Sequence, residues 1–262
     1  MARSTGSGVE GIITRGTTAP RRLRRADRWL TAHHVALLRT PGLLVVDLGF
    51  GDAAATTLEL ARRLRFVNPT AEVVGLDVDP GRVSQAARHS GDGVTFQVGG
   101  FELAGLRPHV VRAFNVLRQY DEAAVPDAWQ RLTARLRPGG LALDGTCDES
   151  GRLGSWVTLD AAGPRSLTLA ADLRLPPATV ATRLPKALIH RNIPGEPVHR
   201  LIDDLDRAWR SRAGLSAFGP AQRFAAAVAD LRTAGWPLLD GPRRWRRGEV
   251  TVPWAAVRPD DR

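Results

Sequence analysis

Short apolar runs alternate with longer amphipathic stretches through the first part of the chain. A short apolar run bounded by turn residues is typical of a strand that is buried on both faces of a parallel sheet. Such runs predict strands at 43–48, 73–77, 94–98, 109–115 and 141–146. Helical spacing predicts helices at 20–38, 53–66 and 81–89, and around Trp129, Leu132 and Leu136. The alternation predicts an α/β fold with a mostly parallel sheet, and right-handed crossovers would place helices on both of its faces.

The rest of the chain follows a less regular pattern. Residues 155–159 and 166–170 could form a hairpin, and prolines interrupt the stretch from 176 to 197. Amphipathic spacing predicts two helices near 198–209 and 221–234, and a last strand follows at 249–257. The expected organisation has four parts: a flexible arm at 1–19, an α/β core at 20–147, an irregular and helical elaboration at 148–240, and a final strand or strands at 241–262 that complete the sheet.

Composition agrees with a globular protein of one large domain, or of one domain with an appended lobe. The chain has 262 residues, of which 43% are hydrophobic. No apolar stretch is long enough to span a membrane, and the small, polar residues 1–11 do not resemble a secretory signal. Cys147 is the only cysteine, so an intramolecular disulfide is excluded. We therefore expect a cytoplasmic location and no membrane partner.

The charge balance leaves two interpretations open. The formal net charge is +10, and Lys186 is the only lysine, so arginine carries nearly all of the positive charge. Arginine pairs with phosphate, and the clusters at 21–28 and 243–247 could hold a nucleic acid, with Trp245 stacking on a base. The alternative is a compositional bias toward arginine, with both clusters as solvated surface. The six histidines have no metal-ligand spacing, so we expect no metal site.

A glycine turn carries the clearest chemical signal. Gly49-Phe50-Gly51 follows a predicted buried strand and precedes a predicted helix, where backbone can approach a ligand and free N–H groups point outward. Asp47 would favour a cationic ligand, and Asp77, at the end of the next strand, could accept both hydroxyls of a ribose. The spacing to Ala54 also fits a dinucleotide-binding turn, although such turns usually have an apolar residue in the position of Asp47.

The stretch from Leu43 to Thr146 resembles class I methyltransferases that use S-adenosylmethionine (SAM). The likeness rests on five motifs in order: Asp-Leu-Gly-x-Gly at 47–51, Gly-Leu-Asp-x-Asp-Pro at 75–80, Val-Thr-Phe-Gln-Val-Gly-Gly at 94–100, Asn-Val-Leu at 115–117 and Leu-Arg-Pro-Gly-Gly at 136–140. The whole chain is also similar to uncharacterised methyltransferase-like proteins of actinobacteria, through Arg-Gly-Thr-Thr at 15–18 and Val-Pro-Trp at 252–254.

The resemblance implies a Rossmann-like, doubly wound, mostly parallel seven-stranded sheet with a C-terminal insertion as cover. It implies SAM as cofactor, with S-adenosylhomocysteine (SAH) as product. The implied cofactor contacts are Asp47, Gly49, Phe50, Gly51 and Asn115 at the methionine end, Asp77 at the ribose, and Val78 and Phe101 at the adenine.

The chain departs from the family pattern at two positions. Ala53 replaces a third glycine, and Gly100 replaces an acid after the third strand, with Glu102 two residues further on. An adenine amino group would then be held by Glu102 or by a backbone carbonyl. The fourth strand also lacks the Asn-Pro-Pro-Tyr type of motif, which argues against methylation of a base amino group. Tyr120, just past that strand, is the candidate for a substrate-side or catalytic role.

The expected reaction is transfer of the sulfonium methyl group to a nucleophile, accelerated largely by proximity and alignment. A small molecule is the favoured acceptor, because segment 148–240 could close a pocket. An RNA or DNA methyltransferase that uses the arginine clusters is the first alternative. A SAM-binding protein without catalytic activity is the second.

Overall fold

The computed structural model describes residues 8–14 and 18–259, so residues 1–7 and 15–17 of the predicted arm lie outside it. None of the described helices is both long enough and apolar enough to cross a membrane. The chain divides into two compact units: Met1–Gly151 with Leu159–Gly163, and Arg152–Thr158 with Pro164–Arg262. The predicted boundaries of the four parts stay a prediction.

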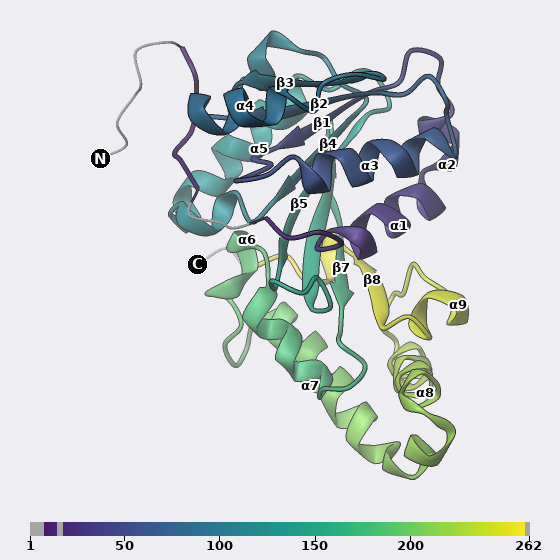
Figure 1. Ribbon diagram of the computed structural model, residues 1–262. Helices are drawn as coiled ribbons and strands as arrows, with labels where there is room; N and C mark the ends of the chain where they lie inside the picture. The colour runs from purple at the N-terminus through teal and green to yellow at the C-terminus, as the bar shows by residue number, and fades with distance from the viewer. Residues whose placement is uncertain (1–7, 15–17, 260–262) are drawn as a thin grey trace. The chain divides into compact units, whose positions relative to one another are not determined.

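The first unit is built on five parallel strands in the order β3-β2-β1-β4-β5 (Figure 1). These strands are β1 (Leu44–Leu48), β2 (Glu72–Asp77), β3 (Val94–Val98), β4 (Val110–Phe114) and β5 (Leu141–Cys147). After β3 the chain crosses β1 and continues on its other side, so the strand order reverses between β1 and β4. In open α/β sheets, ligands bind beyond the carboxyl ends of the strands at such a switch point.

Helices cover this sheet, and α1 packs beside α3 (Figure 1). The helices of the unit are α1 (Arg24–His33), α2 (Val35–Leu38), α3 (Ala55–Arg65), α4 (Pro80–Ala87) and α5 (Val125–Ala134). The prediction of a single helix at 20–38 is wrong in detail. The observed helix begins at Arg24 and is interrupted at His34, whose backbone leaves the helical region (φ −120°, ψ 34°). The interruption leaves Leu30 and Leu38 both fully buried in the core.

The second unit combines strands with helices that lie late in the sequence. Its strands are β6 (Gly154–Asp160), β7 (Gly163–Ala170) and β8 (Glu249–Pro253), and β7 and β8 are antiparallel. Its helices are α6 (Lys186–Ile189), α7 (Pro197–Ser211), α8 (Pro220–Thr233) and α9 (Pro242–Trp245). The two predicted amphipathic helices are confirmed as α7 and α8, which pack together, with Arg223 3.3 Å above the Trp209 ring.

The expected count of seven strands in a mostly parallel sheet is wrong. The described residues form eight strands, and the sheet is mixed because β7 and β8 run antiparallel. The last strand is also shorter than predicted, since Trp254–Ala256 turn into a 3-10 helix after Pro253.

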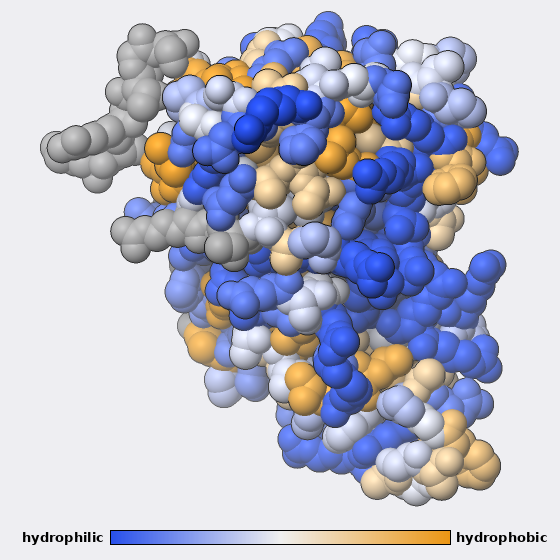
Figure 2. Space-filling view, in the orientation of Figure 1, coloured by the Kyte–Doolittle hydropathy of each residue, from blue (hydrophilic) through white to orange (hydrophobic). Residues whose placement is uncertain are grey.

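The visible surface is dominated by hydrophilic residues, and its apolar residues form small separate patches (Figure 2). The most exposed large apolar side chains, Phe66 and Phe218, come from segments far apart in the sequence. This surface agrees with the high content of arginine.

Candidate functional site

The glycine turn lies directly after β1, and both of its glycines are required by the backbone. Gly49 and Gly51 have φ of 70° and 83°, a region that other residues rarely adopt. A Cβ on Gly49 would also lie 2.6 Å from a methyl group of Val116. The Gly49 N–H donates to the carbonyl of Leu76 at 2.7 Å, which ties the turn to β2. Phe50, between the glycines, is buried and packs edge-on against Phe96.

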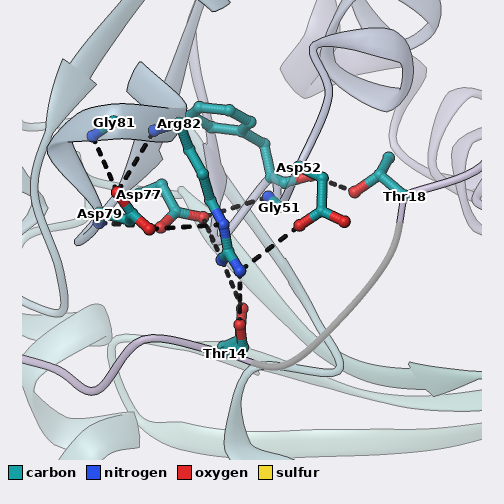
Figure 3. A network of polar contacts seen from close by, with 9 residues as sticks. Thr14, Thr18, Gly51, Asp52, Asp77, Asp79, Gly81 and Arg82 are labelled. Atoms are coloured by element: carbon teal, nitrogen blue, oxygen red, sulfur yellow. Dashed lines mark hydrogen bonds and ion pairs between the residues drawn. The ribbon is translucent and has the colours of Figure 1, made fainter. Parts of the chain in front are cut away.

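Asp77, at the end of β2, faces this turn (Figure 3). Its carboxylate accepts hydrogen bonds from the N–H of Gly51 at 3.1 Å and from that of Asp79 at 3.0 Å. Burial raises the pKa of Asp77, and these two hydrogen bonds and the nearby Arg82 oppose the rise. The guanidinium of Arg82 lies 3.6 Å from the Asp77 carboxylate and 3.4 Å from that of Asp52. The turn and the carboxylate thus form one connected polar cluster.

Asp47 lies in a different environment from the one the motif suggests. One of its oxygens accepts a hydrogen bond from Nε of Arg112 at 3.0 Å, and the other accepts from Nη2 of Arg112 and from the Thr57 hydroxyl, both at 2.7 Å. Arg112 is fully buried in β4 and also donates to Asp27 of α1 at 2.5 Å. Burial raises the pKa of Asp27 even with Arg112 beside it. The Asp47 carboxylate is therefore part of a buried ion cluster that joins α1, β1 and β4.

Val78, Phe101 and Tyr120 line a cavity together with Gly49 and Asp77. Phe101 and Tyr120 contact each other edge to face, with ring centroids 5.4 Å apart. The cavity holds only about 20 Å³, the space of roughly one water. Its remaining lining includes Glu10, Gly11, Ile12 and Thr14 from the N-terminal segment.

Asn115 lies on the other side of the glycine turn. It lines a second small cavity together with Asp47, Gly49 and Arg22. Its side-chain oxygen accepts the N–H of Cys147 at 3.1 Å, and its backbone has a positive φ of 61°. Gly49 lines both cavities, so the structure brings the predicted methionine-end and adenine-end residues to the two sides of one turn.

Tyr120 is held by the N-terminal segment. Its hydroxyl oxygen accepts a hydrogen bond from the N–H of Ile12 at 2.7 Å, and burial raises its pKa. A raised pKa opposes ionisation of this phenol.

Sequence reasoning missed Arg112, Asp27 and Arg82, and it did not foresee that residues 8–14 would lie at the cavity. Arg112 had a usable signal, because a charged residue inside an otherwise apolar strand requires a buried partner. The contact of Glu10 with Glu102 spans 92 positions of sequence and had no such signal.

The arginine cluster at 243–247 offers less to a nucleic acid than its sequence suggests. Trp245 is only 3% exposed and lies under the guanidinium of Arg232, so it is not available to stack on a base. Arg244 is buried and lies 2.9 Å from the carboxylate of Glu249. Among the described residues, no group of three or more His, Cys, Asp or Glu could hold a metal ion.

No family model and no curated protein sequence matches the chain. Solved structures give similarities at low identity. The magnesium protoporphyrin IX methyltransferase ChlM from Synechocystis PCC 6803, with bound SAH, has 22% identity and a TM-score of 0.37 over 47% of this chain and 53% of that one. Human N-acetylserotonin methyltransferase, in complex with SAM, has 21% identity and a TM-score of 0.33 over 50% of this chain and 39% of that one. The methyltransferase CcbJ from Streptomyces caelestis has 18% identity and a TM-score of 0.35 over 58% and 65%.

The chain thus spans about half the length of the first of these proteins. With identities below 25% and TM-scores below 0.5, the assignment of a function depends on the chain's own residues.

Proposed function

We propose that the chain binds SAM at the carboxyl ends of β1, β2 and β3 and transfers its methyl group to a small molecule. The observation that carries this proposal is the buried carboxylate of Asp77 beside the Gly49–Gly51 turn, among five parallel strands whose order reverses next to that turn. A carboxylate at this position can accept both hydroxyls of a ribose, and the turn leaves backbone space for the rest of the ligand.

The residues at the nucleoside end fit the cofactor. Val78 and Phe101 offer apolar surfaces for a flat base, and both line the cavity that Asp77 borders. The backbone N–H of Phe101 and the carboxylate of Glu102 provide a donor beside an acceptor. Adenine presents the complementary pair, because its 6-amino group donates and its ring nitrogen N1 accepts.

The residues at the methionine end can also hold the cofactor, but without a direct contact from Asp47. Three of the hydrogen bonds that Asp47 can accept are already made by Arg112 and Thr57, so we assign Asp47 to the architecture of the site rather than to direct contact. Asp27 and Asp47 both pair with Arg112 in this cluster, and Arg22 lines the cavity beside it. Asn115 and the backbone of Gly49 would then meet the amino-acid part of the ligand.

When bound, the cofactor supplies an electrophilic methyl group. The contribution of the chain is to fix the nucleoside through Asp77, to enclose it between Val78 and Phe101, and to exclude water. Alignment of this kind provides most of the acceleration when the acceptor is already nucleophilic. Tyr120, with its raised pKa, would shape the pocket rather than remove a proton.

A second candidate is a protein that binds SAM without transferring its methyl group. The engagement of Asp47 by Arg112 favours it, since the site then lacks the direct acid contact that the motif suggests. Conversion of SAM to SAH in the presence of candidate small-molecule acceptors separates the two candidates.

Isothermal titration with SAH tests the binding site. Asp77→Asn removes the negative charge, and its one amide oxygen can keep only one of the two N–H groups, because those of Gly51 and Asp79 bind different carboxylate oxygens. We expect it to weaken SAH binding about 100-fold or more, because hydrogen bonds to a charged group contribute about 1.5–3 kcal/mol each and 1.4 kcal/mol is tenfold in affinity.

The matched control is Asp79→Asn, two residues further along. Asp79 caps α4 by accepting the N–H of Gly81, a role that asparagine also fills, so this variant should bind SAH as the wild type does. An Asp77→Asn variant whose affinity for SAH equals that of the wild type would refute the proposal.

A further inference from the structure

Residues 8–14, which we call the strap, lie across the cavity of Val78, Phe101 and Tyr120. Backbone hydrogen bonds hold the strap at three successive points. The carbonyl of Glu10 accepts from the N–H of Phe101 at 2.9 Å, and the N–H of Ile12 donates to the Tyr120 hydroxyl oxygen at 2.7 Å. Nη2 of Arg82 donates to the carbonyl of Thr14 at 2.7 Å (Figure 3). The strap is thus bound to the site by specific polar contacts.

One peptide of the strap uses the same donor and acceptor that suit adenine. The N–H of Glu10 donates to the Glu102 carboxylate at 2.8 Å, as a 6-amino group would. The carbonyl of Glu10 accepts from the N–H of Phe101, as ring nitrogen N1 would. The backbone of Phe101 has a single N–H to donate, so the carbonyl of Glu10 and ring nitrogen N1 of an adenine exclude each other at this edge.

The strap also fills the space in which the base would lie. A Cβ on Gly11 would lie 2.9 Å from a methyl group of Val78 and 3.3 Å from the Tyr120 hydroxyl oxygen, so Gly11 fits tightly between these two walls. A Cβ on Gly100 would lie 1.8 Å from the carbonyl oxygen of Glu10. The glycine at 100, where the resemblance led us to expect an acid, is what permits the strap to approach.

The strap has room to leave. A larger cavity of about 350 Å³ lies beside it, lined by Val9, Glu10, Gly11 and Ile12 on one side and by Phe101, Tyr120 and α5 residues on the other. The carboxylate of Glu10 pairs with Arg131 of α5 at 2.5 Å, where both side chains are about half exposed. Such an exposed pair is weak, so it anchors the strap without locking it.

We propose that the strap is an autoinhibitory segment that occupies the adenine position and that must be displaced before SAM binds. This inference rests on the proposed function and adds to it a control of cofactor affinity by the N-terminal segment. The apparent affinity of a site falls in proportion to the fraction of molecules in which it is open. A strap that is docked in about nine of ten molecules would weaken binding about tenfold.

Gly11→Leu in the full chain tests the proposal, with SAH as the probe in isothermal titration. The larger side chain cannot fit between Val78 and Tyr120, so it should dislodge the strap and lower the dissociation constant up to about tenfold, which is the full gain for a strap docked in nine of ten molecules. The matched control is Gly214→Leu. A Cβ there meets nothing within 4 Å, and we expect unchanged affinity.

The sign of the effect decides the outcome. A strap that closes over the bound ligand would make Gly11→Leu bind more weakly, and that result overturns the inference. An unchanged dissociation constant in Gly11→Leu, with SAH binding intact, also overturns it and leaves the proposed function standing. Failure of both wild type and Gly11→Leu to bind SAH at millimolar concentration refutes the proposed function, and the inference with it.

Hydrogen exchange of the wild-type strap provides a second measurement. The N–H groups of Glu10 and Ile12 are hydrogen-bonded in the free protein, so they should be protected from exchange. Saturating SAH should remove this protection. Protection that is absent from the free protein, or that increases when SAH is added, contradicts displacement of the strap.

Discussion

Replacing Arg112 by methionine should destabilise the first unit by about 3–5 kcal/mol at pH 7.5. Methionine fills a similar volume, but it leaves two buried carboxylates, Asp27 and Asp47, without their counter-charge. Removal of one member of a buried ion pair typically costs this much, because the remaining charge is neither hydrated nor paired. The substitution also removes four hydrogen bonds that the guanidinium donates, three to these carboxylates and one to the carbonyl of Thr56.

The cost has an upper limit that depends on pH. A buried carboxylate can become neutral by binding a proton. For an ordinary aspartate at pH 7.5, protonation costs a free energy of about 5 kcal/mol. The limit falls by about 1.4 kcal/mol for each pH unit. Burial already raises the pKa of Asp27. A group whose pKa is raised in the folded state contributes stability at low pH, and this contribution is lost as pH rises. The deficit of the variant should therefore shrink between pH 7.5 and pH 5.5, by about 1–3 kcal/mol.

Urea unfolding, followed by circular dichroism at several pH values, measures both quantities. Arg131→Met is the matched control in the same unit, because its ion pairs with Glu10 and Asp127 are exposed to solvent. It should leave the unfolding midpoint essentially unchanged. A loss below about 1 kcal/mol for Arg112→Met, or a deficit that is the same at both pH values, would refute the account of the buried cluster.

Two further substitutions test buried polar groups elsewhere. Burial raises the pKa of Asp144 to about 7, and its carboxyl accepts the indole N–H of Trp129 at 2.9 Å. Because this folded-state pKa is raised, the contribution of Asp144 to wild-type stability falls as pH rises from 4 to 7. Asp144→Asn removes this contribution, so the difference in stability between the two proteins should change by about 4 kcal/mol over that range in urea unfolding, and parallel pH profiles would contradict this. Thr168 and Thr251 share a hydrogen bond of 2.9 Å between buried hydroxyls. Thr168→Val should lower the free energy of unfolding by about 1–3 kcal/mol, because it leaves the Thr251 hydroxyl buried without its partner. Adding Thr251→Val should recover part of this loss. A double variant no more stable than the single variant would contradict an unsatisfied hydroxyl as the cause.

Local pattern was sufficient to predict most of the first unit. Four of the five strands from Leu44 to Cys147 are almost wholly buried apolar runs, so the run itself is the signal. The edge strand β3 alternates apolar with polar residues and buries only part of its length. The glycine turn and Asp77 could be located for the same reason, because a strand end and a helix start fix where the chain can bind a ligand. The amphipathic spacing of α7 and α8 also survives in the structure, since each helix buries one face against its neighbour.

The sequence by itself therefore determined the parallel α/β core, the position of the turn and the two long C-terminal helices. Only the tertiary structure decided the number of strands and the mixed sheet, because strand direction follows from pairing between segments distant in sequence. It also decided that Asp47 pairs with Arg112, and that Glu10 meets Glu102 and Phe101. A sequence motif defines which side chains lie at a position. The residues that contact those side chains from distant parts of the sequence depend on tertiary packing. For this chain, the glycine turn and Asp77 come from local pattern, while the segment that covers the site is visible only in three dimensions.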